Sequence, residues 1–211
     1  MRGSREEMKK FQQTKEVLEY SSKYISGKVL DLGAGKGKYK LIIVPRASKY
    51  TALDIKPGKN IDVVGDATDL PFKEESFNTV ICTQVLEHTE RPWVVVREIK
   101  RILTKDGVCI LTTPFLIPSH SDPNDYFRFT CQGLESLFKN EDFEIIESGH
   151  YCQLFSVASE WIRFLFFSPY KSHGQLAKRF IEYLQKISGF LDKFTKNKII
   201  YGNVYIIARK K

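Results

Sequence analysis

The sequence predicts an α/β fold in which helices cover both faces of a parallel sheet. Seven apolar stretches have the length of strands, and helix-favouring segments separate most of them. A glycine-rich turn follows the first stretch, where the chain would pass from a strand into a helix. The chain has 211 residues, 42% hydrophobic and 27% charged, which is enough for one domain with a substantial core.

The predicted strands alternate with predicted helices along most of the chain. The strands are residues 28–33, 49–55, 61–67, 76–84, 107–114, 143–151 and 203–211. Only residues 56–60 separate the second strand from the third, so the usual helical crossover is abbreviated there. Helices are predicted over residues 5–24, in a short segment that Pro45 ends, over residues 92–103 with Pro92 in the first turn, and after a cap at Thr130.

Residues 152–198 interrupt this alternation with two helical segments between the sixth and seventh strands. The first has a polar face of Gln153, Ser156, Glu160 and Arg163 and an apolar face of Leu154, Val157, Ala158, Trp161 and Leu165. The second has an apolar stripe of Leu176, Phe180, Leu184, Ile187, Leu191 and Phe194. We interpret both apolar faces as packing surfaces, with the N-terminal helix as the nearest partner. Residues 1–211 are therefore treated as one domain with an N-terminal helical cap (1–27) and a helical insertion (152–198).

The formal net charge of +8 leaves several classes of partner open. Between residues 161 and 198, eight basic side chains stand against two acidic ones, with aromatic residues between them. Such a segment suits an anionic or lipid-linked acceptor, or contact with the periphery of a membrane. A nucleic acid partner and a lysine-rich solvated surface are further explanations of the charge.

The cysteines and the apolar segments predict a reduced, cytoplasmic protein. The cysteines at positions 82, 109, 131 and 152 form no C-x-x-C pair, and those at 82 and 109 lie in strand-like runs as small buried hydrophobes. The first residues lack an apolar stretch of signal-peptide length. The most apolar helical segment, residues 154–167, contains two charged residues and is too short to span a bilayer.

The first strand leads into the loop VLDLGAGKGKY, residues 29–39, in which Gly33, Gly35 and Gly37 occupy alternate positions. Such a loop turns sharply and admits a ligand against bare main chain. A dinucleotide-binding loop would place its third glycine at position 38, where this chain has Lys38. The loop alone does not decide whether the ligand carries a pyrophosphate.

Three acidic residues lie at or near the carboxyl ends of the first three strands, where open α/β sheets bind their ligands. Asp31 suits an ammonium group, and Asp54 can accept hydrogen bonds from both hydroxyls of a ribose. Asp66 can accept from an adenine amine while the backbone N–H of Ala67 faces a ring nitrogen. This set fits a zwitterion with an adenosine moiety better than a pyrophosphate. The alternative is that Asp66 and Asp69 are turn acids.

The chain resembles the class I S-adenosylmethionine-dependent methyltransferases, in particular their small-molecule branch. The matching segments lie between residues 28 and 114: VLDLGAGKGKY, TALDI, GDATDLPF, FNTVICTQVLEH and REIKRILTKDGVCILTTP. The resemblance implies a Rossmann-like seven-stranded sheet with an antiparallel last strand, and S-adenosylmethionine as cofactor. Family roles assign the methionine part to Gly33, Ala34 and Gly35, the ribose to Asp54 and Ile55, the adenine to Asp66 and Ala67, and the edge of the reaction centre to Gln84.

Two histidines are candidates for the general base that a hydroxyl acceptor needs: His88 after the fourth strand and His120 after the fifth. As an alternative, His88 only hydrogen-bonds a neighbouring loop. Tyr126 and Arg128, in the loop HSDPNDYFRFT, are candidates for binding the acceptor. Arg128 either contacts a phosphate or carboxylate of the substrate or pairs with an acid of its own loop. The spacing of cysteines and histidines predicts no metal site.

These features predict an enzyme that moves a methyl group from S-adenosylmethionine to an oxygen of a sugar, glycan or lipid-linked metabolite. The segment TQVLEH replaces the N-P-P-Y-like motif with which methyltransferases of base amines hold their substrate, so a nucleic acid is not the expected partner. An RNA-modifying methyltransferase and a non-catalytic cofactor-binding module are the alternatives. The sequence names neither the acceptor nor the oligomeric state.

Overall fold

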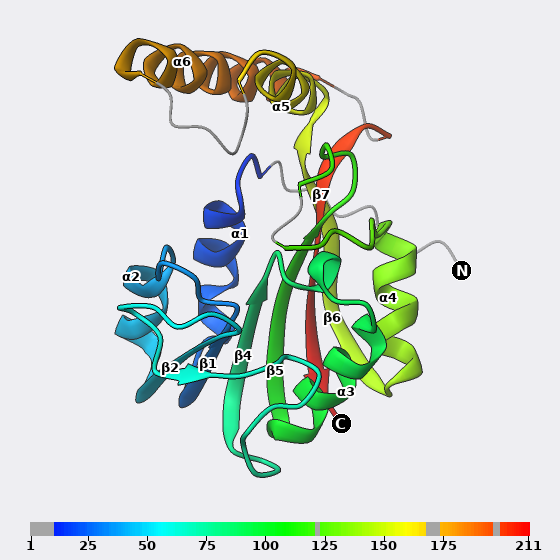
Figure 1. Cartoon of the computed structure of the whole chain (residues 1–211). Coiled ribbons are helices and arrows are strands. Elements are labelled where there is room, and N and C mark those ends of the chain that lie inside the picture. The colour runs from blue at the N-terminus through cyan, green and yellow to red at the C-terminus, as the bar shows by residue number, and fades with distance from the viewer. Residues whose placement is uncertain (1–10, 121–122, 168–173, 196–198) are drawn as a thin grey trace, which may run out of the picture.

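The computed structural model describes residues 11–120, 123–167, 174–195 and 199–211, and its centre is a single seven-stranded sheet (Figure 1). The strands are β1 (Lys28–Leu32), β2 (Lys49–Asp54), β3 (Val63–Val64), β4 (Phe77–Thr83), β5 (Leu103–Pro114), β6 (Phe143–Gln153) and β7 (Tyr201–Lys210). Their order across the sheet is β3-β2-β1-β4-β5-β7-β6. The pairs from β3 to β5 are parallel, and β7 is antiparallel to both β5 and β6. The predicted fold class is confirmed.

Helices cover both faces of the sheet. They are α1 (Thr14–Ser21), α2 (Lys40–Ile43), α3 (Pro92–Ile102), α4 (Cys131–Asn140), α5 (Leu154–Phe166) and α6 (Gln175–Asp192), with 3-10 turns at Ser22–Tyr24, Val44–Arg46 and Leu86–His88. Leu18 of α1 and Ile43 of α2 are fully buried in the core on one face. Ile99 of α3 and Phe138 of α4 are fully buried in the core on the other. Each face of the sheet therefore has its own apolar core, as expected for strands buried on both sides.

Several local predictions are confirmed. The Oγ1 of Thr130 accepts a hydrogen bond from the backbone N–H of Gly133 at 3.0 Å and caps α4. Pro92 occupies the first turn of α3. Within the described residues no helix lies between β2 and β3, so the crossover is abbreviated. Of the helix predicted over residues 5–24, α1 and the turn after it are present, and residues 5–10 lie outside the described ranges.

α5 and α6 form a separate layer beyond the carboxyl ends of the parallel strands (Figure 1). α5 starts directly where β6 ends, and Asp192 at the end of α6 accepts hydrogen bonds from the backbone N–H groups of Phe155 (2.8 Å) and Ser156 (3.1 Å). The hydroxyls of Ser188 and Ser159 meet at 3.1 Å between the helices. The seam between α5 and α6 is therefore built from polar side chains.

The prediction that the apolar stripe of the second helix packs against the protein is wrong. Leu176 is 83% exposed, Phe180 51% and Phe194 70%. The reason is that polar contacts hold the layer in place. Besides the seam, the N-terminal segment contacts α5 through Gln12, whose Oε1 accepts from the hydroxyl of Ser156 at 3.0 Å. These contacts turn the polar sides of both helices inward, which leaves the apolar stripe facing outward.

The remaining expectations from composition concern the cysteines and the membrane. Cys82 and Cys109 are fully buried, as predicted, and all four cysteines are free of disulfides. Among the described residues, no helix combines the length and apolar character needed to cross a membrane.

Candidate active site

The glycine loop between β1 and α2 folds over the end of β2. The backbone N–H groups of Gly33 and Ala34 both donate to the carbonyl oxygen of Leu53, at 2.8 and 3.0 Å. Gly33 has a φ of +74°, and a Cβ there would lie 2.3 Å from the side chain of Val85, so only glycine fits. Gly35 has a φ of +52° and open space where a Cβ would be. The loop thus presents bare main chain to a ligand, as predicted.

A cavity of about 590 Å³ lies against this loop, a volume typical of small-molecule sites. Residues predicted to bind the cofactor form much of its lining: Gly33, Gly35, Asp54, Ile55, Ala67 and Gln84. The Oδ2 of Asp54 accepts from the backbone N–H of Gly35 at 2.9 Å, and its Oδ1 accepts from that of Lys56 at 3.0 Å. Each carboxylate oxygen has a second lone pair that a ribose hydroxyl can use. Asp54 therefore organises the loop and still has capacity for a ligand.

Three other residues predicted to bind the cofactor do not line this cavity: Asp31, Ala34 and Asp66. Asp31 is only 2% exposed, and the hydroxyl of Tyr50 donates to it at 2.8 Å. Burial, reinforced by the charge of Asp54, raises the pKa of Asp31 to about 6, although the bond from Tyr50 opposes the shift. Asp66 accepts from the backbone N–H and the hydroxyl of Thr68, at 2.7 and 2.8 Å, so it is a turn acid. Its contact with adenine stays a prediction.

Gln84 stands where the first cavity meets a second one of about 470 Å³ and lines both. Its φ of +56° lies in the left-handed region, which is uncommon for residues other than glycine and concentrated at functional sites. The backbone N–H of Gln84 donates to the carbonyl oxygen of Thr112 at 2.8 Å, and its Nε2 donates to the hydroxyl of Thr112 at 3.2 Å. These bonds fix the side chain at the end of β4.

The second cavity lies between the sheet, the N-terminal segment and the α5–α6 layer. Its walls include residues 12–15, Tyr151 at the end of β6, and the inner side chains Ser156, Arg163 and Gln185. Most of these groups are polar. The polar face predicted for the first helix of the insertion, from Ser156 to Arg163, therefore faces this cavity.

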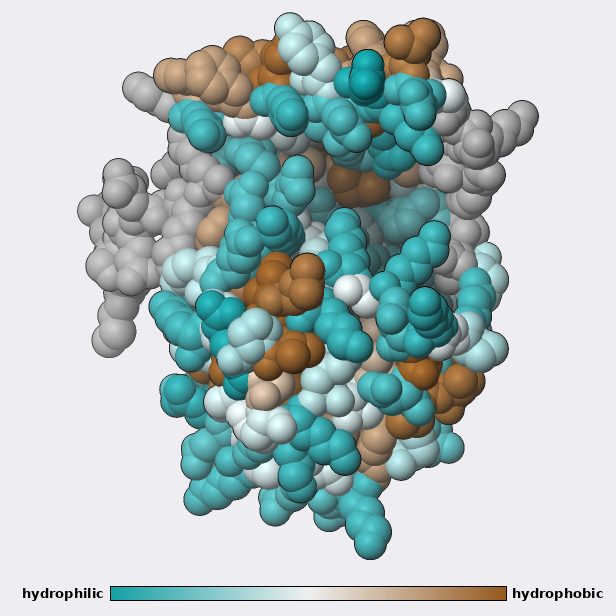
Figure 2. All heavy atoms as spheres, turned by 90° about the vertical axis from the view of Figure 1, so that its left-hand side faces the viewer, coloured by the Kyte–Doolittle hydropathy of each residue, from teal (hydrophilic) through white to brown (hydrophobic). Residues whose placement is uncertain are grey.

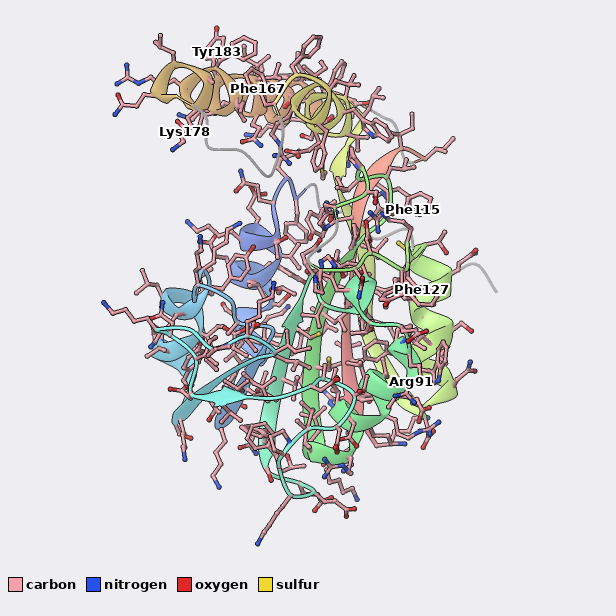
Figure 3. The ribbon with its side chains drawn as sticks, in the orientation of Figure 1. Arg91, Phe115, Phe127, Phe167, Lys178 and Tyr183 are labelled. Carbon is pink, nitrogen blue, oxygen red and sulfur yellow. The ribbon has the colours of Figure 1, made fainter. Side chains whose placement is uncertain are left out.

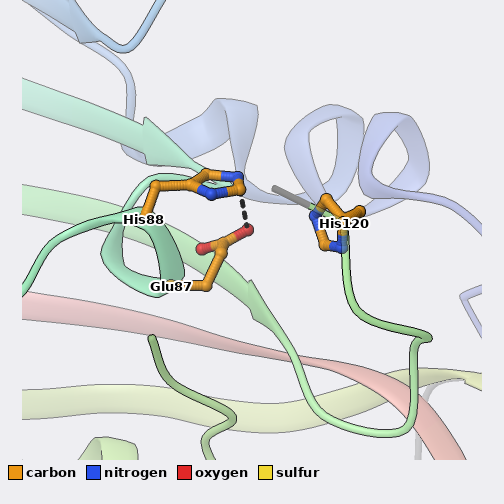
Figure 4. Close-up of side chains that lie close together, drawn as sticks. All are labelled: Glu87, His88 and His120. Carbon is orange, nitrogen blue, oxygen red and sulfur yellow. Dashed lines mark ion pairs between the residues drawn. The ribbon is translucent and has the colours of Figure 1, made fainter. Parts of the chain in front are cut away.

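His88 and His120 lie side by side, with their ring centroids 5.2 Å apart and their planes nearly perpendicular (Figure 4). His88 lines the first cavity and His120 the second. Glu87 is fully buried beside them, with its Oε1 at 3.9 Å from Nε2 of His88. This Oε1 has no hydrogen-bond partner among the described residues, whereas Oε2 accepts from the hydroxyl of Thr113 at 3.2 Å. Burial raises the pKa of Glu87 to about 8.

The contacts of the two rings define their basic atoms. Nδ1 of His88 lies 2.6 Å from the carbonyl oxygen of Asn124, and Nδ1 of His120 lies 3.1 Å from that of Pro118. Because a carbonyl oxygen can only accept, we assign the proton of each neutral ring to Nδ1, which leaves the lone pair on Nε2. The hydrogen bond predicted for His88 as an alternative to catalysis is thus present, but it uses the nitrogen that does not face Glu87.

The same three side chains could hold a metal ion. The ligand atoms of Glu87, His88 and His120 all lie within 4.8 Å of one another. Histidines that bind a metal through Nε2 commonly donate their Nδ1 proton to a backbone carbonyl, as both rings do here. The sequence predicts no metal at this position, so removal of metal ions is a direct test of how the cluster works.

The loop after β5 is held by an internal ion pair between Arg128 and Asp125. The guanidinium donates to both carboxylate oxygens, at 2.6 Å to Oδ2, and the remaining donors reach the carbonyl oxygens of Ile117, Pro118 and Phe127. Burial disfavours the charged form of Asp125, but the hydrogen bonds from Arg128 and from the backbone N–H of His120 outweigh it and hold the pKa of Asp125 well below its usual range. Of the two alternatives for Arg128, the structure contains the internal pair.

Neither Arg128 nor Tyr126 lines the two cavities. Tyr126 is 47% exposed, and its backbone N–H donates to the carbonyl oxygen of Glu87 at 2.7 Å. The backbone N–H of His120 donates to Asp125 at 2.8 Å, so the Arg128–Asp125 pair positions His120. Contact of Tyr126 or Arg128 with an acceptor stays a prediction.

Three residues that contact the predicted site residues are not identified from the sequence: Glu87, Tyr50 and Tyr151. Glu87 could have been found, because an acid directly before a candidate base in LEH is a local signal. Tyr50 and Tyr151 lie inside strands, where the local sequence does not indicate what their hydroxyls contact. The hydroxyl of Tyr50 donates to Asp31, and the hydroxyl of Tyr151 lies 3.5 Å from Nε2 of Gln84.

Comparison with known proteins agrees with this geometry. Residues 30–111 match the model of a family described as the methyltransferase domain. Together with the strand order and the glycine loop, the match identifies a class I S-adenosylmethionine-dependent methyltransferase domain. S-adenosylmethionine is the cofactor of this class.

Individual relatives show a local match in sequence and a nearly complete match in fold. YcgJ of Bacillus subtilis, named as an uncharacterized methyltransferase, is 29% identical over 113 residues, and the match covers 46% of this chain and 42% of YcgJ. A Mycobacterium ulcerans protein named "Probable phthiotriol/phenolphthiotriol dimycocerosates methyltransferase 2" is 36% identical over 98 residues, and the match covers 39% of this chain and 38% of that protein. The chain therefore spans about two fifths of the length of the curated relatives it matches.

The likeness in fold extends further along the chain. The crystal structure of YcgJ superposes with a TM-score of 0.60 at 19% identity, covering 93% of this chain and 98% of YcgJ. An S-adenosylmethionine-dependent methyltransferase from Mesorhizobium loti superposes with a TM-score of 0.61 at 15% identity, covering 92% of this chain and 96% of that one.

Proposed function

We propose that the protein transfers a methyl group from S-adenosylmethionine to an oxygen of a small-molecule acceptor of the sugar, glycan or lipid-linked class. The junction at Gln84 carries the proposal, because a cavity lined by the glycine loop and Asp54 meets a second, mostly polar cavity there. A transferase needs two sites with a common wall, since the reacting atoms must approach to about 3 Å in line.

The first cavity fits the cofactor. Gly33 and Gly35 offer a main-chain surface without side chains, Asp54 offers carboxylate oxygens for the ribose, and Ala67, which lines the same cavity, would face the adenine. The buried charge of Asp31 beneath the loop favours the ammonium group of the methionine part. When bound, S-adenosylmethionine supplies a methyl group on a positively charged sulfur, which is already activated for transfer. The protein's own task is to orient the two substrates, which is worth roughly 7–11 kcal/mol.

The second task is to take the proton of an acceptor hydroxyl, and the Nε2 atoms of His88 and His120 suit it. A positioned general base contributes about 10²–10⁴-fold to the rate. A proton on His88 creates a positive ring 3.9 Å from Glu87, which favours the carboxylate form of that buried acid. Glu87 thereby balances the charge that the ring gains.

The acceptor class is supported by the walls of the second cavity. Hydroxyl, amide and guanidinium groups from Ser156, Gln185 and Arg163 suit a hydroxyl-rich molecule. Arg163 is paired with Glu160 at 2.7 Å, so the wall carries no uncompensated charge at that point. The relative from Mycobacterium ulcerans has a triol in its name, which agrees with an alcohol oxygen as acceptor.

The experiment is a methyl-transfer assay with isotopically labelled S-adenosylmethionine against sugars, lipid-linked glycans, quinols and RNA. Transfer to an oxygen of one of the first three classes supports the proposal. Transfer to RNA with a steep salt dependence would replace it by an RNA-modifying activity. Tight cofactor binding without transfer to any acceptor would favour a non-catalytic module.

A further inference from the structure

The α5–α6 layer exposes an apolar surface on the side away from the active site. We call this surface the outer face and define it by six side chains: Leu165 (75% exposed), Phe166 (75%), Leu176 (83%), Phe180 (51%), Tyr183 (64%) and Phe190 (59%). Figure 2 shows hydrophobic atoms along the outer edge of this layer and hydrophilic atoms on the side toward the rest of the molecule. A group of exposed large apolar side chains on one side of a helical layer is typical of an interaction site.

The outer face is a regular feature of α6. Leu176, Phe180, Tyr183 and Phe190 recur at steps of three, four and seven residues, so they lie on one side of the helix. Tyr183 points outward, and Lys178 points from the opposite side of the helix (Figure 3). The inward positions Gln185, Ser188 and Asp192 are polar and bonded to α5. The helix therefore turns its polar side toward the protein and its apolar side outward, the reverse of a helix that packs on a core.

The charges next to the outer face indicate what covers it. Arg179, Lys186 and Lys193 follow one another at seven-residue spacing, are all exposed, and lie along one edge of the apolar stripe. A helix with aromatic and leucine side chains on one side and basic residues at its edge is typical of segments that lie in the interface of an anionic bilayer. A second copy of this chain would instead place the same basic rows close together, in a protein with a net charge of +8.

We propose that the outer face docks the protein on the surface of an anionic lipid bilayer, with the apolar side chains in the interface and the basic row at the headgroups. The inner side of the same helices lines the second cavity, so docking holds that cavity one helical layer away from the membrane surface. On the basis of the proposed function, the acceptor is then a lipid-linked molecule whose head group reaches the cavity around the edge of this layer.

The test is co-sedimentation of the full chain with vesicles of phosphatidylcholine alone or mixed with phosphatidylglycerol. The wild-type protein should bind the mixed vesicles, and added salt should weaken binding because the charge contribution is screened. The triple variant Leu176→Ser, Phe180→Ser, Phe190→Ser should lower the partition coefficient by about tenfold or more. A second variant on the other helix, Leu165→Ser with Phe166→Ser, should lower it as well.

Two controls separate this effect from loss of fold or general stickiness. Leu41→Ser removes an apolar side chain that is 89% exposed on α2, and vesicle binding should not change. Arg179→Gln with Lys186→Gln should weaken binding to phosphatidylglycerol-containing vesicles and leave the weak binding to phosphatidylcholine unchanged. In every variant, calorimetric affinity for S-adenosylmethionine should equal that of the wild type.

Three outcomes overturn docking: no binding of the wild type to the mixed vesicles, equal binding of both outer-face variants and the wild type, or a wild-type dimer that the triple variant converts to a monomer without any vesicle binding. The last outcome would make the outer face a contact between copies. Vesicle binding is measured without methyl transfer, so a protein that binds vesicles but methylates no acceptor would overturn the proposed function and leave docking intact.

Discussion

The cofactor half of the protein and the α5–α6 layer distribute polar and apolar groups in opposite ways. From β1 to β5, apolar side chains such as Leu30, Ile81 and Ile110 are fully buried, and the first cavity is lined by the glycine loop and Asp54 at the strand ends. In α5–α6 the buried groups include Ser159, Ser188 and Asp192, while leucines and phenylalanines are exposed.

The difference shows that a helix is oriented by whichever of its sides finds specific partners. The first region folds around a core, where burial of apolar area is worth about 25 cal/mol per Å². The second region is held by hydrogen bonds across a polar seam and to Gln12 of the N-terminal segment, each worth about 0.5–1.5 kcal/mol. The two regions should therefore respond differently to mutation.

The largest effect should come from removing the second region. Replacing residues 154–195 by a short turn takes away the inner wall of the second cavity and leaves Gly33, Asp54 and Ala67 in place. We expect methyl transfer to be lost while calorimetric affinity for S-adenosylmethionine stays within a few-fold of the wild type. A folded deletion variant with full activity on the true acceptor would show that the layer is not part of the acceptor site, and loss of cofactor binding would show that the two regions are not separable.

Removing the proton acceptor should have the next largest effect. Replacing the responsible histidine, His88 or His120, with alanine should lower turnover by about 10²–10⁴-fold with little change in cofactor affinity. His150→Ala is the matched control, because His150 stacks on Tyr201 with ring centroids 4.3 Å apart and lines neither cavity. Turnover close to wild type in both single variants would leave alignment as the sole source of catalysis.

Removal of metal ions tests whether His88 and His120 act as bases or as metal ligands. If the imidazoles act as bases, dialysis against EDTA should leave turnover unchanged. Loss of activity that a divalent cation restores would instead make Glu87, His88 and His120 a metal site and would contradict the assignment of a histidine as base.

The buried acid beside the histidines should make stability depend on pH. The pKa of Glu87 is raised from 4.5 to about 8 by burial, so the stabilising contribution of its protonated form is complete below pH 4.5 and is lost as the pH rises through 8. Glu87→Gln has no proton to lose. Its free energy of unfolding in urea, relative to wild type, should therefore increase between pH 5 and pH 9 by on the order of 4 kcal/mol. The exposed Glu90→Gln is the control, and an identical pH profile for Glu87→Gln and wild type would contradict the burial effect.

The smallest effect should be a graded loss of cofactor affinity. Asp54→Ala removes hydrogen bonds to a partly exposed carboxylate and loosens the glycine loop that Asp54 holds. Affinity for S-adenosylmethionine should fall by about tenfold or more, since 1.4 kcal/mol is a factor of ten. Asp69→Ala, an exposed acid nearby, should bind as the wild type does. Tight binding of NAD, or unchanged affinity in Asp54→Ala, would contradict the assignment of the first cavity.

The sequence by itself determined the fold and most of the cofactor cavity. Strand periodicity, the alternate glycines and the acids at strand ends are local patterns, and parallel strands bring their carboxyl ends to one edge of the sheet. Gly33, Gly35, Asp54, Ile55, Ala67 and Gln84 therefore come together as predicted. The cap at Thr130 and the place of Pro92 were also predictable, because each depends on a few neighbouring residues.

Only the tertiary structure decided how the α5–α6 layer is oriented and which partners surround the histidines. The spacing of the apolar residues in α6 predicted an amphipathic helix. Which way its apolar side faces depends on Asp192, Ser188 and Gln12, which contact α5 from distant parts of the sequence. The choice of Arg128 between a substrate and Asp125 likewise depends on the path of a loop. Local sequence encodes the period of a side-chain pattern, whereas the neighbour that each side meets is set by the packing of the whole chain.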